Sequence, residues 1–149
     1  MNKTTFIEQY ALKDNNIKTL ERLENIKKSV KTVKDIAIKF DYETINDECD
    51  TKSARCDYMH VMYNKHNIIE CYAKKNNTLY CLVRTTVLDY ATLNKSFTVE
   101  KKSEKITRVI ISDSDFSKLY NTVCKAITST TATATKKSTA KKKTASKEA

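Results

Sequence analysis

Apolar residues recur at alternating intervals of three and four in the first third of the chain. They are Leu23, Ile26, Val30, Val33, Ala37 and Phe40. This heptad spacing predicts one long helix over residues 17–40, preceded by a short N-terminal helix. The apolar stripe has two interpretations. Either it packs against the rest of the same chain, or it forms a homodimer through Leu23, Ile26, Val30, Val33 and Phe40.

The hydrophobic period changes to two between residues 58 and 112. Four to five segments there alternate apolar and polar residues, which is typical of antiparallel strands with one buried face. Two of them, 67–74 and 78–87, are joined through Asn76 and Asn77. Asn tolerates the positive φ angles of a type I′ hairpin turn, so we expect a two-residue turn at this point.

A final helix is predicted over residues 114–127, with a helical spacing of apolar residues and an acidic first turn. The predicted fold is therefore α+β: a short and a long N-terminal helix, a four- to five-stranded antiparallel sheet, a C-terminal helix and a disordered basic tail. Residues 1–127 make one domain and residues 128–149 make the tail. The block of strands followed by a helix resembles the small modules of the Whirly and PUR families, which implies binding of single-stranded nucleic acid.

Positive charge is concentrated at the C-terminal end. The formal net charge is +10, and residues 128–149, with six lysines and one glutamate, carry +5 of it. The rest of this segment is Thr, Ser and Ala, which cannot bury enough apolar surface to order a chain, so we expect disorder. Its composition resembles the Lys-, Ala-, Ser- and Thr-rich tails of linker histones and of some bacterial nucleoid proteins, which implies DNA binding.

These patterns predict contacts to phosphates by the lysines of the tail. The candidate nucleic-acid-binding residues are Lys136, Lys137, Lys141, Lys142, Lys143 and Lys147. A two-residue turn in the first hairpin places Tyr80 and Arg84 on one face of the sheet and Tyr72 and Lys74 on the other. An exposed face with either pair is suited to stacking bases, although tyrosine is also favoured in strands for packing alone. Tyr80 and Arg84 therefore join the candidates.

Cysteine and histidine give only a weak metal signal. Cys49, Cys56, His60 and His66 are the candidate ligands, but no C-x-x-C knuckle occurs among the five cysteines. The chain contains no Gly and hence no Gly-rich phosphate loop, and no catalytic signature surrounds Cys56. We therefore expect no enzyme, no cofactor and no metal. In the predicted register, Cys71 and Cys81 point to opposite faces and cannot form a disulfide.

The rest of the composition bears on the source genome and on the cellular location of the protein. Gly and Pro are both absent, while Lys and Asn are abundant, a bias that indicates an AT-rich genome. No apolar run approaches the length of a membrane span, and the N-terminal residues show no secretory signal. We therefore expect a cytoplasmic, nucleoid-associated or nuclear protein that is not secreted.

The sequence thus predicts a non-enzymatic, sequence-tolerant nucleic-acid-binding protein, with DNA favoured over RNA and a flexible lysine arm supplying affinity. The alternative is a structural or adaptor protein, such as a viral or phage component, that dimerises or binds an acidic protein partner. No membrane partner is expected, because no apolar face accompanies the lysines of the tail.

Overall fold

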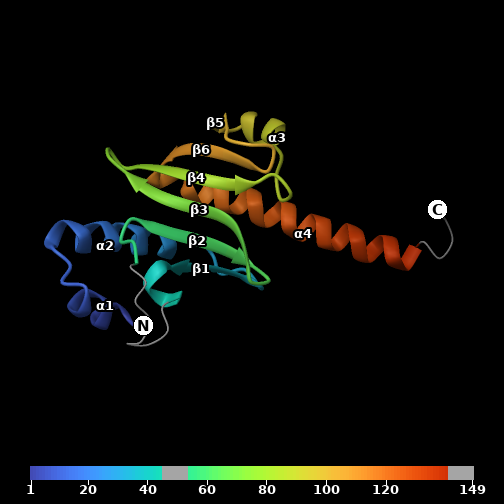
Figure 1. Cartoon of the computed structure of the whole chain (residues 1–149). Coiled ribbons are helices and arrows are strands. Elements are labelled where there is room, and N and C mark those ends of the chain that lie inside the picture. Colours follow the sequence, from blue (N-terminus) through green and yellow to red (C-terminus); the bar gives the residue numbers. More distant parts are fainter. Residues whose placement is uncertain (45–53, 141–149) are drawn as a thin grey trace.

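The chain folds around one antiparallel sheet of six strands (Figure 1). The computed structural model describes the backbone of residues 1–44 and 54–140 and the side chains of residues 1–44 and 54–128. The strands are β1 Ile36–Phe40, β2 Tyr58–Tyr63, β3 His66–Lys74, β4 Thr78–Arg84, β5 Thr98–Lys101 and β6 Ile106–Ser112. Their order in the sheet is β1-β2-β3-β4-β6-β5. The predicted α+β class is confirmed, with more strands than the sequence analysis predicts.

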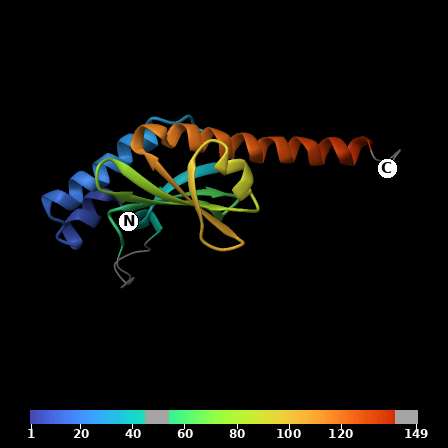
Figure 2. The ribbon, with the colours of Figure 1, turned by 90° about the horizontal axis from the view of Figure 1, so that it is seen from above.

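Helices cover one face of this sheet. The helices are α1 Lys3–Gln9, α2 Asp14–Lys28, α3 Tyr90–Asn94 and α4 Phe116–Ala140, with 3₁₀ turns η1 Asp41–Thr44 and η2 Asp113–Asp115. In the view from above, α2 and α4 run along the same side of the sheet (Figure 2). Alternation along each strand therefore separates a face buried under α2 and α4 from a face that these two helices leave uncovered.

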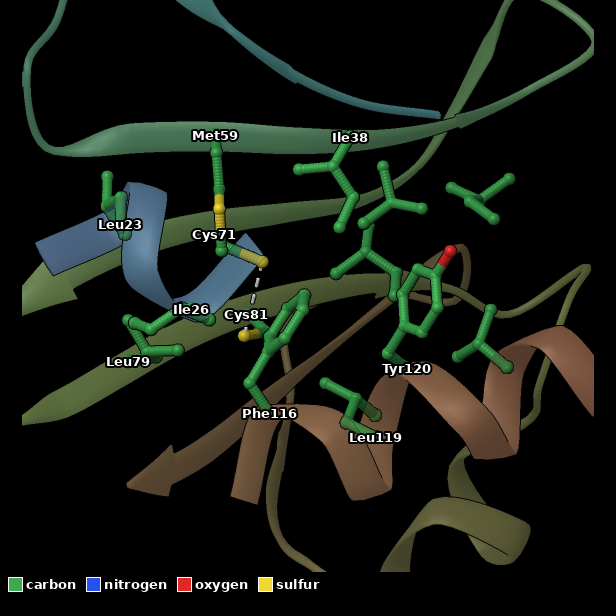
Figure 3. Close-up of a cluster of buried hydrophobic side chains, with 14 of the residues drawn as sticks. Leu23, Ile26, Ile38, Met59, Cys71, Leu79, Cys81, Phe116, Leu119 and Tyr120 are labelled. Atoms are coloured by element: carbon green, nitrogen blue, oxygen red, sulfur yellow. Dashed lines mark hydrogen bonds between the residues drawn. The ribbon is translucent and has the colours of Figure 1, made fainter. Parts of the chain in front are cut away.

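The core fills the space between the sheet and these helices. Figure 3 shows Leu23 and Ile26 of α2 and Phe116 of α4 directed toward the strands. Each of these side chains is at least nine-tenths buried, as are Met59 of β2 and Cys71 of β3 beneath them. Close packing of this kind is the main source of the stability of the domain.

The predicted long helix over residues 17–40 is wrong in its second half. Helix α2 ends at Lys28, and residues 36–40 form the edge strand β1. Ile36, Ile38 and Phe40 are buried, while Ala37 and Lys39 are exposed, so this segment follows a period of two. Its β-branched residues favour a strand over a helix, and the heptad spacing continued into it by coincidence.

The apolar stripe packs within the chain, as the first of its two interpretations predicts, so it gives no support to a homodimer through the same residues. Leu23, Ile26 and Phe40 are buried in the core of the same chain, and Val30 and Val33 pack against that core. The stripe is thus used within the chain.

The first hairpin has a different register from the predicted one. Asn76 and Asn77 do adopt positive φ angles of 59° and 55°, and the amide of Thr78 donates to the carbonyl of Lys75 over 3.2 Å. The ladder nevertheless pairs Lys74 with Thr78, so a three-residue loop joins the strands. This difference of one residue exchanges the faces of every side chain on one strand relative to the other.

Cys71 therefore lies directly opposite Cys81, on the buried face, with the two sulfur atoms 3.5 Å apart (Figure 3). The prediction that the two thiols face away from one another is wrong. Burial raises the pKa of the Cys71 thiol well above its usual range, and the adjacent Cys81 thiol adds to this effect. Cys71 is thus kept as a neutral thiol inside the core.

Helix α4 continues beyond the predicted boundary of the domain. Its first turns hold buried Phe116, Leu119, Tyr120 and Val123, as the helical spacing predicts. The backbone then stays helical to Ala140, with no Gly or Pro to interrupt it, although most of residues 128–140 are Thr and Ser, which favour a helix less than Ala and Lys do. The predicted disordered tail thus begins within a helix, and residues 141–149 lie outside the described part of the chain.

Candidate nucleic-acid interface

The face of the sheet turned away from α2 and α4 is here named the open face. In strands β3, β4 and β6 it comprises Glu70, Tyr72, Lys74, Thr78, Tyr80, Leu82, Arg84, Ile106, Arg108, Ile110 and Ser112. Tyr72 pairs directly with Tyr80 across β3 and β4. Their sequence neighbours Cys71 and Cys81 point into the core, so strand alternation requires the two tyrosine rings to lie on the open face.

Cations gather around these two rings in a depression of about 310 Å³. The aromatic-basic depression, as it is named from here on, is lined by Arg55, Tyr72, Lys74, Tyr80, Leu82, Lys102 and Arg108. Among the described residues, it thus combines four cationic side chains and two tyrosines and has no acidic residue in its lining. Proteins that bind single-stranded nucleic acid without sequence preference combine a positively charged groove with aromatic side chains in the same way.

The cations lie over the tyrosine rings in the unbound protein. The guanidinium of Arg55 is 5.2 Å from the ring centroid of Tyr72, and that of Arg108 is 5.2 Å from the ring centroid of Tyr80. The ammonium of Lys74 lies between the rings, 5.9 Å from the centroid of Tyr72 and 5.4 Å from that of Tyr80. An exposed contact of this kind contributes about 0.5–1 kcal/mol, which a ligand can readily replace.

Ion pairs fix the arginines but leave two lysines available. Arg55 donates two hydrogen bonds of 2.8 Å to Asp57, and Arg108 donates one of 2.9 Å to Glu100. Neither acid lines the depression, but each partly neutralises the arginine that it pairs with. Among the described residues, no ion pair involves Lys74 or Lys102. These two ammonium groups therefore provide uncompensated positive charge at the site.

Tyr72 stays neutral at physiological pH. Burial raises the pKa of Tyr72, and the carboxylate of Glu70 raises it further. A neutral ring is the form that stacks on a base without repelling its phosphate.

The candidate residues of the folded domain meet on one face, but in a different combination from the predicted one. Tyr80 and Arg84 do share a face, and Tyr72 and Lys74, predicted for the opposite face, join them there. Arg84 contacts Glu70 at 3.4 Å and does not line the depression. The corrected register thus brings together both aromatic residues that the sequence analysis considered separately.

Three cations of the depression were missed in the sequence analysis. Arg108 alternates with the apolar residues Ile106 and Ile110 of β6, and pairing β6 with β4 was the signal that placed it opposite Leu82. Lys102 follows the end of β5. Arg55 lies in the segment before β2, where no periodic pattern indicates a direction for its side chain.

The lysines of the tail are only partly within the described residues. The backbone of Lys136 and Lys137 belongs to α4, while Lys141, Lys142, Lys143 and Lys147 lie outside the described residues. Figure 1 shows the end of α4 extending well past the sheet, on the side opposite α1 and α2. The described charge of the site therefore comes from the folded domain.

A larger depression, of about 560 Å³, lies next to the first and shares Lys74 with it. It is less suited to an anion. Arg22 in its lining is already engaged by two hydrogen bonds of 2.6 and 2.7 Å to Asp113, and the carboxylate of Asp57 lies in the same lining. The aromatic-basic depression is therefore the candidate site.

The weak metal candidates are separated in the structure. His60 is buried on β2, Cys56 is half-buried before β2, and His66 is exposed at the start of β3. Cys49 lies outside the described residues. In the part of the chain that the structure describes, no three His, Cys, Asp or Glu side chains come together as metal ligands. Burial raises the pKa of the Cys56 thiol, with a further contribution from Asp57, which disfavours the nucleophilic thiolate.

Comparisons with known proteins leave the geometry as the basis for assigning a function. No family model, no curated protein and no solved structure matches the chain. The resemblance to Whirly and PUR modules therefore carries no further argument. Of the helices in the described residues, none is long and apolar enough to cross a membrane.

Proposed function

We propose that this protein is a non-enzymatic nucleic-acid-binding protein that tolerates any base sequence. The aromatic-basic depression carries this proposal, because four cations surround two tyrosines there, and no acid lines it in the part of the chain that the structure describes. Arginine and lysine bind phosphates irrespective of the base, and aromatic rings accept any base face. The site thus supplies both parts of a sequence-tolerant interface.

The C-terminal lysines add an electrostatic arm to this interface. The six lysines after residue 135 raise the local concentration of positive charge without requiring a fixed structure. They increase affinity and its dependence on salt, while the open face fixes where the strand lies.

No observation favours the adaptor alternative to a similar degree. The apolar stripe proposed for a partner is used in the core, and the described residues expose no large hydrophobic side chain. A protein interface usually requires a central apolar cluster, and the described surface lacks one.

The proposal is tested by titrating the full-length protein with a fluorescent 20-nucleotide DNA strand at several salt concentrations. We expect tight binding at low salt and a linear loss of log affinity with log salt. Exchanging all six lysines of the tail for glutamine in the full chain should lower the slope by about four to five. No binding of the wild-type protein at low salt would refute the proposal.

A matched pair of double variants tests the role of the open face. Lys74→Gln with Lys102→Gln removes two charges from the depression, and we expect the slope to fall by about two. Lys28→Gln with Lys34→Gln removes the same charge from exposed positions outside the depression. Equal loss of affinity in both double variants would show that net charge alone, and not the open face, determines binding.

A further inference from the structure

The inference concerns the form of nucleic acid that the open face accepts, and it rests on the proposed function. We infer that the aromatic-basic depression selects unpaired strands, with the bases of two neighbouring nucleotides stacked on Tyr72 and Tyr80. The cations around the rings then contact the phosphates of the same nucleotides.

The first argument is the position of the rings. Tyr72 and Tyr80 are directly opposite one another on β3 and β4, so their side chains start about 5 Å apart. Their rings belong to a surface shared by several strands, with Leu82 beside them and Arg108 on the next strand. Two bases splayed from one backbone can each meet one ring on such a surface.

The second argument excludes a duplex from the same contacts. Within a double helix the faces of the bases are covered by their neighbours, and only their edges are accessible in the grooves. A sheet of six strands spaced about 4.8 Å apart is about 24 Å wide, which is twice the width of the major groove of about 12 Å. The open face therefore reaches the phosphates of a duplex but neither enters its groove nor stacks on its bases.

The third argument is the exchange of cations for bases. Arg55, Lys74 and Arg108 cover the rings of Tyr72 and Tyr80 in the free protein. A base that stacks on a ring displaces the cation from the ring, and the phosphate attached to the base becomes its new partner. Planar guanidinium groups also stack on bases, so Arg55 and Arg108 extend the platform at either end. A duplex offers phosphates to the cations but no base faces to the tyrosine rings, so its binding gains no stacking free energy.

The experiment compares a 20-nucleotide oligodeoxythymidine strand with the duplex that it forms with oligodeoxyadenosine, at one salt concentration, by fluorescence anisotropy. We expect the full-length protein to bind the single strand at least about 10-fold more tightly, the effect of about 1.4 kcal/mol of stacking. Tyr72→Ala and Tyr80→Ala should each weaken binding of the single strand by about 10-fold and leave binding of the duplex unchanged. The salt slope should be unchanged in both variants, because no charge is removed.

Two controls separate stacking from folding. Tyr72→Phe and Tyr80→Phe keep the rings, so the affinity for the single strand should stay within about 3-fold of wild type. Tyr90→Ala removes a half-buried tyrosine from α3, outside the depression, and should not change the preference.

The outcomes distinguish this inference from the proposed function. Equal affinity of the wild-type protein for both forms, or equal loss for both forms in the alanine variants, overturns the inference and leaves the proposed function standing. No binding of either form overturns both.

Discussion

The two faces of the sheet are made by the same strands and differ in almost every property. Along β3, Cys71 points to the helices and is fully buried, while Tyr72, the next residue, is half-exposed beside two cations. Along β4, Cys81 and Tyr80 repeat this contrast. The face under α2 and α4 is apolar, and the open face is aromatic and basic.

Under the proposed function, this comparison divides stability and binding between alternate residues of the same strands. Burial of apolar surface under the helices supplies the favourable free energy of folding, whereas the open face retains groups that water or a ligand can reach. Substitutions on the covered face should therefore change the free energy of unfolding, and substitutions on the open face should change affinity.

The largest expected effect is on the covered face, at Phe116. This ring is fully buried and stacks on Tyr120, with the centroids 6.0 Å apart. Phe116→Ala should lower the free energy of unfolding by about 3–5 kcal/mol, measured by urea denaturation, because a cavity is left in the core. Tyr80→Ala on the open face should lower it by less than about 1 kcal/mol. A similar loss in both variants would show that the two faces contribute equally to stability.

Two arginines allow a matched test of the same division. Arg22 of α2 donates two hydrogen bonds to Asp113, and it also donates to the carbonyls of Lys74 at 2.8 Å and Thr78 at 2.9 Å. It thus ties the covering helix to the ends of β3 and β4. Arg22→Gln should lower the free energy of unfolding by about 2–3 kcal/mol, since charged hydrogen bonds are lost.

The matching change on the open face is Arg108→Gln. Its ion pair with Glu100 is surface-accessible, so the free energy of unfolding should change by less than about 1 kcal/mol. Its affinity for a DNA strand should fall, with the salt slope lower by about one. Arg22→Gln should bind as wild type when folded. The division of roles fails if Arg22→Gln loses affinity and Arg108→Gln does not.

His60 of β2 is an exception to the contrast between a buried covered face and an accessible open face. His60 pairs with Glu70 across the ladder, on the side away from the core, yet its side chain is only 6% exposed. Both ring nitrogens lack a hydrogen-bond partner among the described residues. Burial lowers the pKa of His60, and the carboxylates of Asp41, Glu70 and Glu43 partly oppose this effect, while Lys39 supports it.

This lowered pKa predicts that acid destabilises the fold through His60. The unfolded chain takes up a proton near pH 6.5, where the folded chain still holds the neutral ring. The contribution of His60 is therefore complete above this pH and is lost as the pH falls toward the lowered pKa of the folded state. Urea denaturation between pH 7.5 and 5 should show a smaller loss of stability in His60→Gln than in wild type. His66→Gln, at an exposed position, is the control and should behave as wild type.

The sequence alone predicted those helices and strands whose apolar residues follow one clear hydrophobic period. The alternation in β2, β3, β4 and β6 and the helical spacing at the start of α4 predicted these elements nearly to their ends. Residues 36–40 were assigned wrongly because Phe40 fits both a heptad and a strand period. The β-branched Ile36 and Ile38 favour the strand only weakly by themselves, and their burial in the tertiary structure decides between the two.

The site was harder to predict than the fold, because it depends on a register. Asn76 and Asn77 were correctly identified as the turn, but the paired residues differ by one position from those of a two-residue loop. That single step decides whether Tyr72 shares a face with Tyr80. Arg55 could not be assigned at all, since only its ion pair with Asp57 and its contact with Tyr72 fix its direction.

The smallest expected effect is at Glu100, the acidic partner of Arg108. Its side chain is 54% exposed, so Glu100→Gln should change the free energy of unfolding by no more than about 0.5 kcal/mol. The substitution removes a negative charge beside the aromatic-basic depression and frees Arg108 for a phosphate. Affinity for a DNA strand should therefore rise by about 2- to 3-fold, equivalent to about 0.5 kcal/mol, in an anisotropy titration at low salt.

The control is Glu21→Gln, which makes the same change in net charge at an exposed position of α2. It should leave affinity nearly unchanged, because salt screens a charge on the covered side from a strand bound on the open face. An equal rise in both variants would mean that the strand responds to the total charge of the protein and not to the open face.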